Sequence, residues 1–134
     1  MRTFAEFAAD LCGMTVTGVQ RVYSAPPESL NSANLPALFP MLPEGDLAPL
    51  TFGAAEYSGR RTLELWIPVK AAAQGTLAEA YVGLTALMDN LDAALRTLND
   101  AVPYRLTWSV RASLLTVAGT DYRGAVVTAT AEED

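Results

Sequence analysis

Apolar side chains recur at helical spacing near the start of the chain, at Phe4, Phe7, Ala8 and Leu11. Thr3 and Glu6 have the spacing of a capping box, in which each side chain binds the other residue's backbone N–H. Gly13 suits the exit of a helix. We therefore predict a short helix over residues 4–11. This helix must dock its apolar side on something, because an isolated helix of that length is marginal in water.

A longer helical pattern occupies residues 76–98, where leucine recurs every seven residues at Leu77, Leu84, Leu91 and Leu98. Thr76 and Glu79 form a second capping-box pair. A single apolar side predicts a helix that packs on a sheet or pairs as a coiled coil. We favour packing on a sheet because the chain has both helical and strand patterns. On the other side, Asp92 and Arg96 are an i, i+4 pair typical of a solvated face. The side chains expected against the sheet are Leu84, Leu87, Leu91 and Leu95.

The rest of the chain alternates apolar and polar residues, which is the period of β-strands. Residues 50–57 and 61–69 flank Ser58-Gly59 and predict a hairpin that turns at this dipeptide. Pro68 has no amide donor, so we place the end of the second strand at an edge or just outside the ladder.

A second strand pair follows the long helical pattern. Residues 105–113 alternate, but Leu114 and Leu115 are both apolar, so we expect a bulge or a bend there. After a turn, a last strand leads into residues 131–134, which we expect to form a frayed acidic tail. With a short strand within 16–24, the elements predict an α+β fold: a largely antiparallel sheet with the long helix and the short N-terminal helix packed on it.

Six of the eight prolines lie within residues 26–50, a density that opposes helices and central strands. We therefore expect residues 24–49 to form a long, proline-rich loop that is ordered in the assembled state. Its apolar side chains either anchor in a neighbouring chain or cover the protein's own sheet, and both hypotheses stay open. The candidates for a protein interface are Leu35, Leu38, Phe39 and Leu42, together with the adjacent basic pair Arg60 and Arg61.

Length and charge limit the classes of function. The 134 residues are enough for one domain, 1–134, but not for two independent cores. Only 18% of residues are charged, below the usual value of about 25%, which either reflects a high alanine content or is a first sign that another protein covers part of the surface. A net charge of −6 disfavours surface binding of nucleic acid. Because neither a signal peptide nor a bilayer-length apolar run is seen, we expect a soluble protein made in a cytoplasm.

Few residues in this chain could carry chemistry. It has no histidine and one cysteine, which excludes Ser-His and Cys-His pairs and histidine or thiolate metal sites. Phosphate-loop and dinucleotide motifs are also missing. Asp89 and Asp92 could form a carboxylate pair, and Cys12 could be a nucleophile. We favour a solvated helix face for the carboxylates and a buried apolar role for the thiol. We therefore predict no enzyme, no catalytic residue, no cofactor and no metal.

The segment "GVQRVYSAPPESLNSANLPALFP" (residues 18–40) and the order of elements after it resemble the tail terminator, or minor tail, proteins of long-tailed bacteriophages. The resemblance implies an α+β subunit of a homo-oligomeric, hexameric ring. Such a ring caps the tail tube protein and joins it to the head-side connector protein. It also implies a place in the virion, assembly in the host cytoplasm, and DNA that passes through the lumen without specific binding. No membrane and no catalytic residue are implied.

Two other functions fit the same pattern. The first is a different phage neck or tail protein, such as a head-closure subunit or a tube subunit. The second is a non-viral domain that binds a small ligand, which predicts a deep apolar pocket and a stable monomer.

Overall fold

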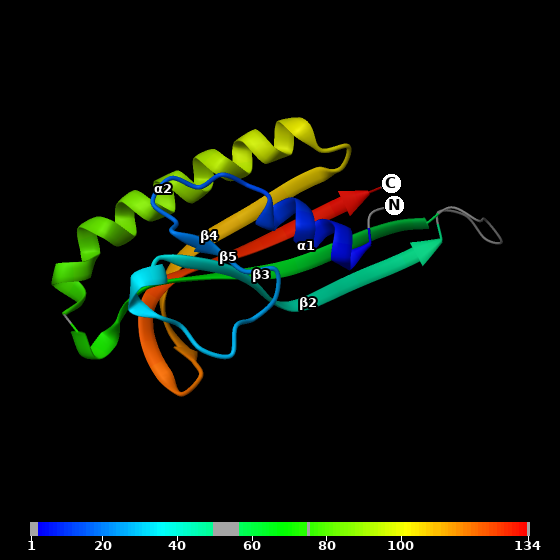
Figure 1. The fold of residues 1–134 in the computed structure, drawn as a ribbon. Helices are drawn as coiled ribbons and strands as arrows, with labels where there is room; N and C mark the ends of the chain where they lie inside the picture. The colour runs from blue at the N-terminus through cyan, green and yellow to red at the C-terminus, as the bar shows by residue number, and fades with distance from the viewer. Residues whose placement is uncertain (1–2, 50–56, 75, 134) are drawn as a thin grey trace.

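Two helices cover one face of a mixed β-sheet in this protein (Figure 1). The computed structural model describes residues 3–49, 57–74 and 76–133, and the sheet formed by these residues has five strands in the order β1-β2-β3-β5-β4. Strand β1 pairs in parallel with β2, and the other neighbours are antiparallel. The prediction of an α+β fold with a largely antiparallel sheet is confirmed.

The strands are of very unequal length. Their bounds are Arg21–Val22 for β1, Ala37–Pro49 for β2, Tyr57–Ala71 for β3, Arg105–Val117 for β4 and Thr120–Glu133 for β5. The helices are α1, Phe4–Cys12, and α2, Leu77–Ala101, with short 3-10 turns at Ser32–Asn34 and Ala72–Gln74. Helix α2 packs mainly over β4 and β5, whereas α1 packs on β2.

Both helices begin where the capping residues predict. Before α1, the N–H of Glu6 donates to Thr3 Oγ1 at 3.1 Å and the N–H of Thr3 donates to Glu6 Oε1 at 3.2 Å, which completes the capping box. Before α2, the N–H of Glu79 donates to Thr76 Oγ1 at 3.2 Å. These bonds satisfy backbone donors that a helix start leaves without an intrahelical partner.

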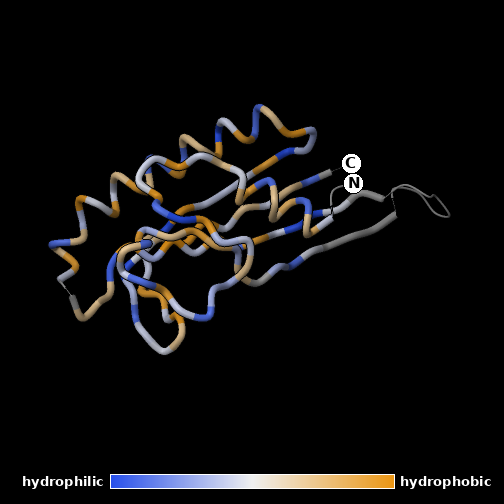
Figure 2. Tube along the Cα trace, viewed as in Figure 1, coloured by the Kyte–Doolittle hydropathy of each residue, from blue (hydrophilic) through white to orange (hydrophobic). Residues whose placement is uncertain are grey.

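The main core lies between the helices and the sheet. Hydrophobic and hydrophilic positions alternate along α2 in Figure 2, and its hydrophobic side faces the sheet. The expected leucines are buried there, so the helix on a sheet is confirmed: Leu84, Leu87, Leu91 and Leu95. Phe7 of α1 packs in the same core. Its ring lies edge-on to the ring of Tyr104, and the two ring centres are 5.8 Å apart.

A second, smaller cluster lies on the opposite face of the sheet, at one end. Phe39, Val117 and Tyr122 are buried in it, and Trp66 packs beside them. Phe39 belongs to this cluster whereas the preceding Leu38 belongs to the main core, because successive side chains of a strand point to opposite faces. The connection between β1 and β2 covers the cluster with Leu30 and Leu35, among other side chains.

The expected loop over residues 24–49 is corrected, because residues 37–49 form strand β2. Only residues 37 and 38 of β2 pair with β1, so within the described residues most of its outer edge has no partner strand. Proline is tolerated at such an edge and at bulges, and the register with β3 shifts between Pro40 and Pro43. A high density of proline therefore marks an edge strand here.

The expected turn at Ser58-Gly59 is wrong. Both residues belong to β3 and lie opposite Ala48 and Leu47 of β2, while most of the expected first strand, residues 50–56, is outside the described residues. Pro68 does not end β3 either. It lies at a register shift opposite Gly124, where a Cβ would overlap the carbonyl oxygen of Ile67.

Two expectations for the last strand pair are also corrected. The register of β4 with β5 is unbroken through Leu114 and Leu115, so there is no bulge; Leu115 is buried and Leu114 is exposed on the other face. The predicted acidic tail is largely strand, because β5 continues to Glu133. Glu132 is held there by an ion pair with Arg60 at 3.0 Å.

Candidate functional site

The proline-rich segment does not present the apolar anchors that the sequence suggested. Leu38 and Phe39 are each 1% exposed, so we correct them from interface candidates to core residues. Leu35 is half-buried against the second cluster, and the side chain of Leu42 lies outside the described ones. This placement agrees with the alternative in which the segment covers its own sheet.

The basic pair divides between the two faces of β3. Arg60 is exposed and forms its ion pair with Glu132. Arg61 is only 8% exposed, and its guanidinium lies 5.1 Å from the centre of the Phe4 ring at the start of α1. Since a cation over an aromatic ring is attracted to it, Arg61 helps to seat α1 and does not face a partner.

Of the groups considered for chemistry, Asp92 and Cys12 are used in packing, whereas Asp89 is exposed on α2. Asp92 accepts from Arg96 Nε at 2.8 Å and from Trp108 Nε1 at 2.9 Å, so it ties α2 to β4. The hydrogen bond from Arg96, followed by that from Trp108, lowers the pKa of Asp92 below its usual value. Cys12 is half-buried, and its burial raises the pKa of the thiol, which disfavours a reactive thiolate.

Two absences can be stated for the described part of the chain. No group of three or more acidic or cysteine side chains is placed there to hold a metal ion. Within the same residues, no helix is both long enough and apolar enough to cross a membrane.

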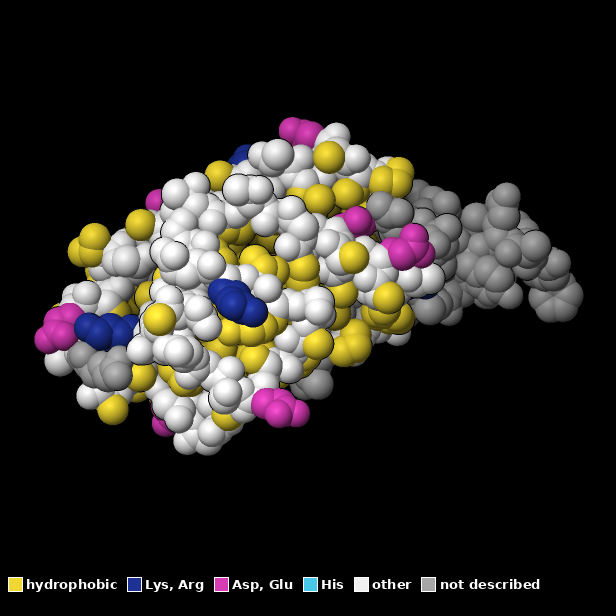
Figure 3. All heavy atoms as spheres, in the orientation of Figure 1, with side chains coloured by type: hydrophobic (Ala, Val, Ile, Leu, Met, Phe, Trp, Pro, Cys, Tyr) yellow, Lys and Arg dark blue, Asp and Glu magenta, His cyan; other side chains and the backbone are white. Residues whose placement is uncertain are grey.

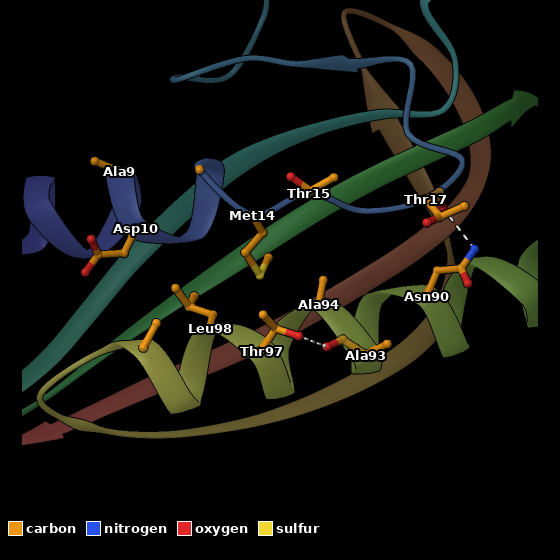
Figure 4. A pocket seen from close by; sticks show the side chains of 12 residues that line it. Ala9, Asp10, Met14, Thr15, Thr17, Asn90, Ala93, Ala94, Thr97 and Leu98 are labelled. Carbon is orange, nitrogen blue, oxygen red and sulfur yellow. Dashed lines mark hydrogen bonds between the residues drawn. The ribbon is translucent and has the colours of Figure 1, made fainter.

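A groove of about 580 Å³ lies between α1 and α2 (Figure 4). Small side chains such as Ala9 and Ala93 line it together with Met14. The polar groups drawn there are partly used by the protein itself, since Asn90 Nδ2 donates to the Thr17 carbonyl at 2.9 Å. The ligand-binding alternative predicted a deep apolar pocket, and this is a groove between helices with mixed polar and apolar walls.

The sheet face without helices is polar away from the second cluster. The hydroxyl oxygens of Thr62 and Thr130 are 3.1 Å apart, and Arg111 Nη2 lies 3.9 Å from Glu64 Oε2. A hollow of about 360 Å³ lies beside them over β2, β3 and β5. Glu44 and Glu64 line this hollow. Ion pairs such as Arg60–Glu132 and Arg111–Glu64 on the same face are typical of an antiparallel sheet with one solvated face.

The outer edge of β4 is open over much of its length. The N–H of Leu106 donates to the side chain of Asn99 at 3.1 Å, so Leu106 turns its backbone groups away from β5. In an antiparallel ladder every second residue does so, and the register of β4 is unbroken. No strand of the described part of the chain lies beyond β4. The residues that direct their backbone N–H and C=O groups to this edge are therefore Trp108, Val110, Ala112, Leu114 and Thr116. Of these groups, the Leu114 carbonyl accepts from Ser113 Oγ at 3.4 Å.

Exposed apolar side chains occur on β4 and in the first turns of α2. Leu77 and Tyr81 of α2 and Leu114 of β4 are 52%, 61% and 55% exposed, and we call these three residues the edge patch. Leu77 and Leu114 also line one shallow hollow, which shows that they lie close together. Figure 3 shows that charged side chains are few and scattered on the face that it presents.

The sequence pattern did not indicate that the residues of the edge patch would be exposed together. Leu77 continues the heptad of leucines, but it lies beside Leu114 at the β4 edge and is 52% exposed. A sequence pattern gives the apolar side of a helix and does not give the length of the surface beneath it.

Comparison with protein-family models gives no match for this chain, and no curated protein matches it. Any functional proposal therefore rests on the fold, on the surfaces described above and on the resemblance of residues 18–40.

Proposed function

We propose that this protein is a structural subunit that works in an assembly, a tail terminator whose ring caps a phage tail tube and joins it to the head-side connector. The phage setting comes from the resemblance of residues 18–40 and of the order of elements. The proposal that the chain assembles comes from its surface, which has a long open strand edge beside the edge patch. This edge is the observation that carries the proposal.

An open edge supports assembly for a physical reason. Unpaired N–H and C=O groups along a strand are a template for another chain, and proteins usually blunt such edges with prolines or charges. The β2 edge has Pro40, Pro43 and Pro49, whereas β4 has no proline and, between Trp108 and Thr116, only Arg111 as a charge. The unblunted edge is therefore the one that we expect another chain to cover.

The proposal includes no catalytic role. Asp92 and Asn90 make the contacts described above, and the Cys12 thiol donates to the Tyr23 carbonyl at 3.7 Å. In the ring that we propose, six copies surround a lumen through which DNA passes without specific binding, and an acidic subunit suits such a lumen because it does not attract phosphates.

The α1–α2 groove supports a second candidate function, a domain that binds a small ligand. Its volume of about 580 Å³ lies in the range typical of ligand sites. This candidate predicts a stable monomer, and its groove lies between the helices, on a part of the molecule separate from the edge patch.

Negative-stain electron microscopy of the purified chain tests the proposal. We expect discrete rings of one size. Open-ended tubes would instead identify a tube-forming subunit, and particles that stay monomeric at every protein concentration would contradict assembly and favour the ligand-binding candidate.

A further inference from the structure

We propose that two copies of this chain pair through β4, edge to edge and antiparallel, about a twofold axis at Ala112. A ring closes by contacts between two different surfaces of each subunit, whereas this contact uses one surface twice. The inference therefore goes beyond the proposed ring and concerns the protein before it joins one, when the open edge needs a cover.

The occupant of the edge is a second copy because, among the residues that the structure describes, the sheet offers one suitable edge. On the opposite side, β1 has only two residues and the exposed part of β2 has prolines, so continuous pairing of β4 with that side is disfavoured. An edge that pairs with its own copy needs no second strand. Antiparallel pairing about a twofold axis meets this condition, because it places β4 opposite β4.

The position of the axis follows from the open backbone groups. With the axis at Ala112, Trp108 lies opposite Thr116 of the second copy and Val110 lies opposite Leu114, so every open residue meets another open residue. An axis at Val110 would place Leu114 opposite Leu106, whose N–H is already bonded to Asn99. An axis at Ser113 would place Trp108 opposite Ala118, which belongs to the β4–β5 turn and has a positive φ of 51°.

Charge argues against a twofold axis at Arg111. An axis at Arg111 would place this residue directly opposite its own copy, and like charges facing each other across strands are destabilising. With the axis at Ala112, Arg111 lies directly opposite Ser113, and its own copy is a more distant diagonal neighbour. The pattern of charge along β4 therefore agrees with the pattern of backbone groups.

The edge patch fits the same axis. Leu114 is on the helix side of β4, so pairing about Ala112 brings it against Val110 of the second copy. Leu77 lines a hollow with Ala112 and Leu114, so the first turns of α2 lie beside the axis. The two edge patches then face each other, and the apolar side chains exposed in one copy are covered by those of the other.

Disulfide trapping tests this contact with a matched control. Residues at the axis have Cα atoms about 5.5 Å apart in a hydrogen-bonded antiparallel pair, which is within the range that a disulfide spans. We therefore expect Ala112→Cys to form a covalent dimer under mild oxidation. Ser109→Cys should not, because its two copies would lie roughly 20 Å apart along the strands. The unaltered chain, which keeps Cys12, is the baseline for both variants.

A second variant tests the edge patch without cysteine chemistry. Leu114→Lys places two like charges near the axis and should convert the dimer to a monomer in light scattering, with the circular dichroism melt of the monomer retained. Val22→Lys is the control, because Val22 is an exposed apolar residue on β1, at the opposite edge of the sheet.

The experiments distinguish failure of the β4 contact from failure of the proposed ring. Equal cross-linking of the two cysteine variants, or a dimer that Leu114→Lys leaves intact, would overturn the β4 contact and leave the ring proposal standing. Trapping at Ala112 in a protein that forms no rings would support the β4 contact and count against the ring.

Discussion

Asp92 illustrates at the scale of one residue how a surface charge becomes part of the fold. It accepts from Arg96 one turn later in α2 and from Trp108 on the edge strand. The spacing of Asp92 and Arg96 was predictable from the sequence, because i, i+4 pairs follow from helix geometry. The bond to Trp108 was not, because it depends on where α2 lies relative to β4.

The lowered pKa of Asp92 predicts the pH dependence of this contact. A group whose pKa is lower in the folded state stabilises the fold above its unfolded pKa, and this contribution is lost as pH falls through the folded pKa. We therefore expect the melting temperature of Asp92→Asn to be below that of the parent chain at neutral pH. The difference should shrink as pH falls below about 4, the ordinary range of an aspartate. A difference that is constant over this range would show that the carboxylate charge is not involved.

Leu91 gives a prediction about packing. Its side chain is fully buried between α2 and the sheet, so Leu91→Ala should lower the free energy of unfolding by about 2–5 kcal/mol. Denaturant titration measures the change. Val82→Ala on the exposed side of the same helix is the control and should change it by less than about 0.5 kcal/mol. Equal effects of both variants would contradict the assigned face of α2.

At the scale of elements, the helices were predictable and the first strands were not. Capping residues and a 3.6-residue period are local, so α1 and α2 could be placed to within a few residues. The identity of β2 depended on its position at an edge, where proline is tolerated, and an edge is a property of the whole sheet. Ser58-Gly59 has the chemistry of a turn, but both residues lie within β3. Nine residue pairs join β3 to β2, and the pairing continues on both sides of this dipeptide.

Phe39 of β2 leads to a prediction about the second cluster. Phe39→Asp places a charge among Trp66, Val117 and Tyr122, so we expect a clearly lower melting temperature. The loss should be at least the roughly 3–5 kcal/mol typical of removing a buried phenylalanine. Val22→Asp, an exposed change in the neighbouring strand, should melt close to the parent chain. Loss of assembly without a lower melting temperature would restore Phe39 as an interface residue.

At the scale of the whole molecule, the fold class followed from the sequence and the assembly surfaces did not. The count of apolar residues and the scarcity of charge suggested that a partner covers part of the surface. They could not tell which apolar residues would stay exposed, and the candidates in residues 35–42 that are described proved to be buried or half-buried. The edge patch emerges only when α2, β4 and the end of the sheet are placed together.

The mass of the purified, unaltered protein in solution tests the central claim, which is that this chain works as an assembled structural subunit. Native mass spectrometry over a dilution series should show multiples of the 14.3 kDa chain, with a ring of one size at high concentration and a dimer as the smaller species. A single species at 14.3 kDa over the whole series would contradict the account.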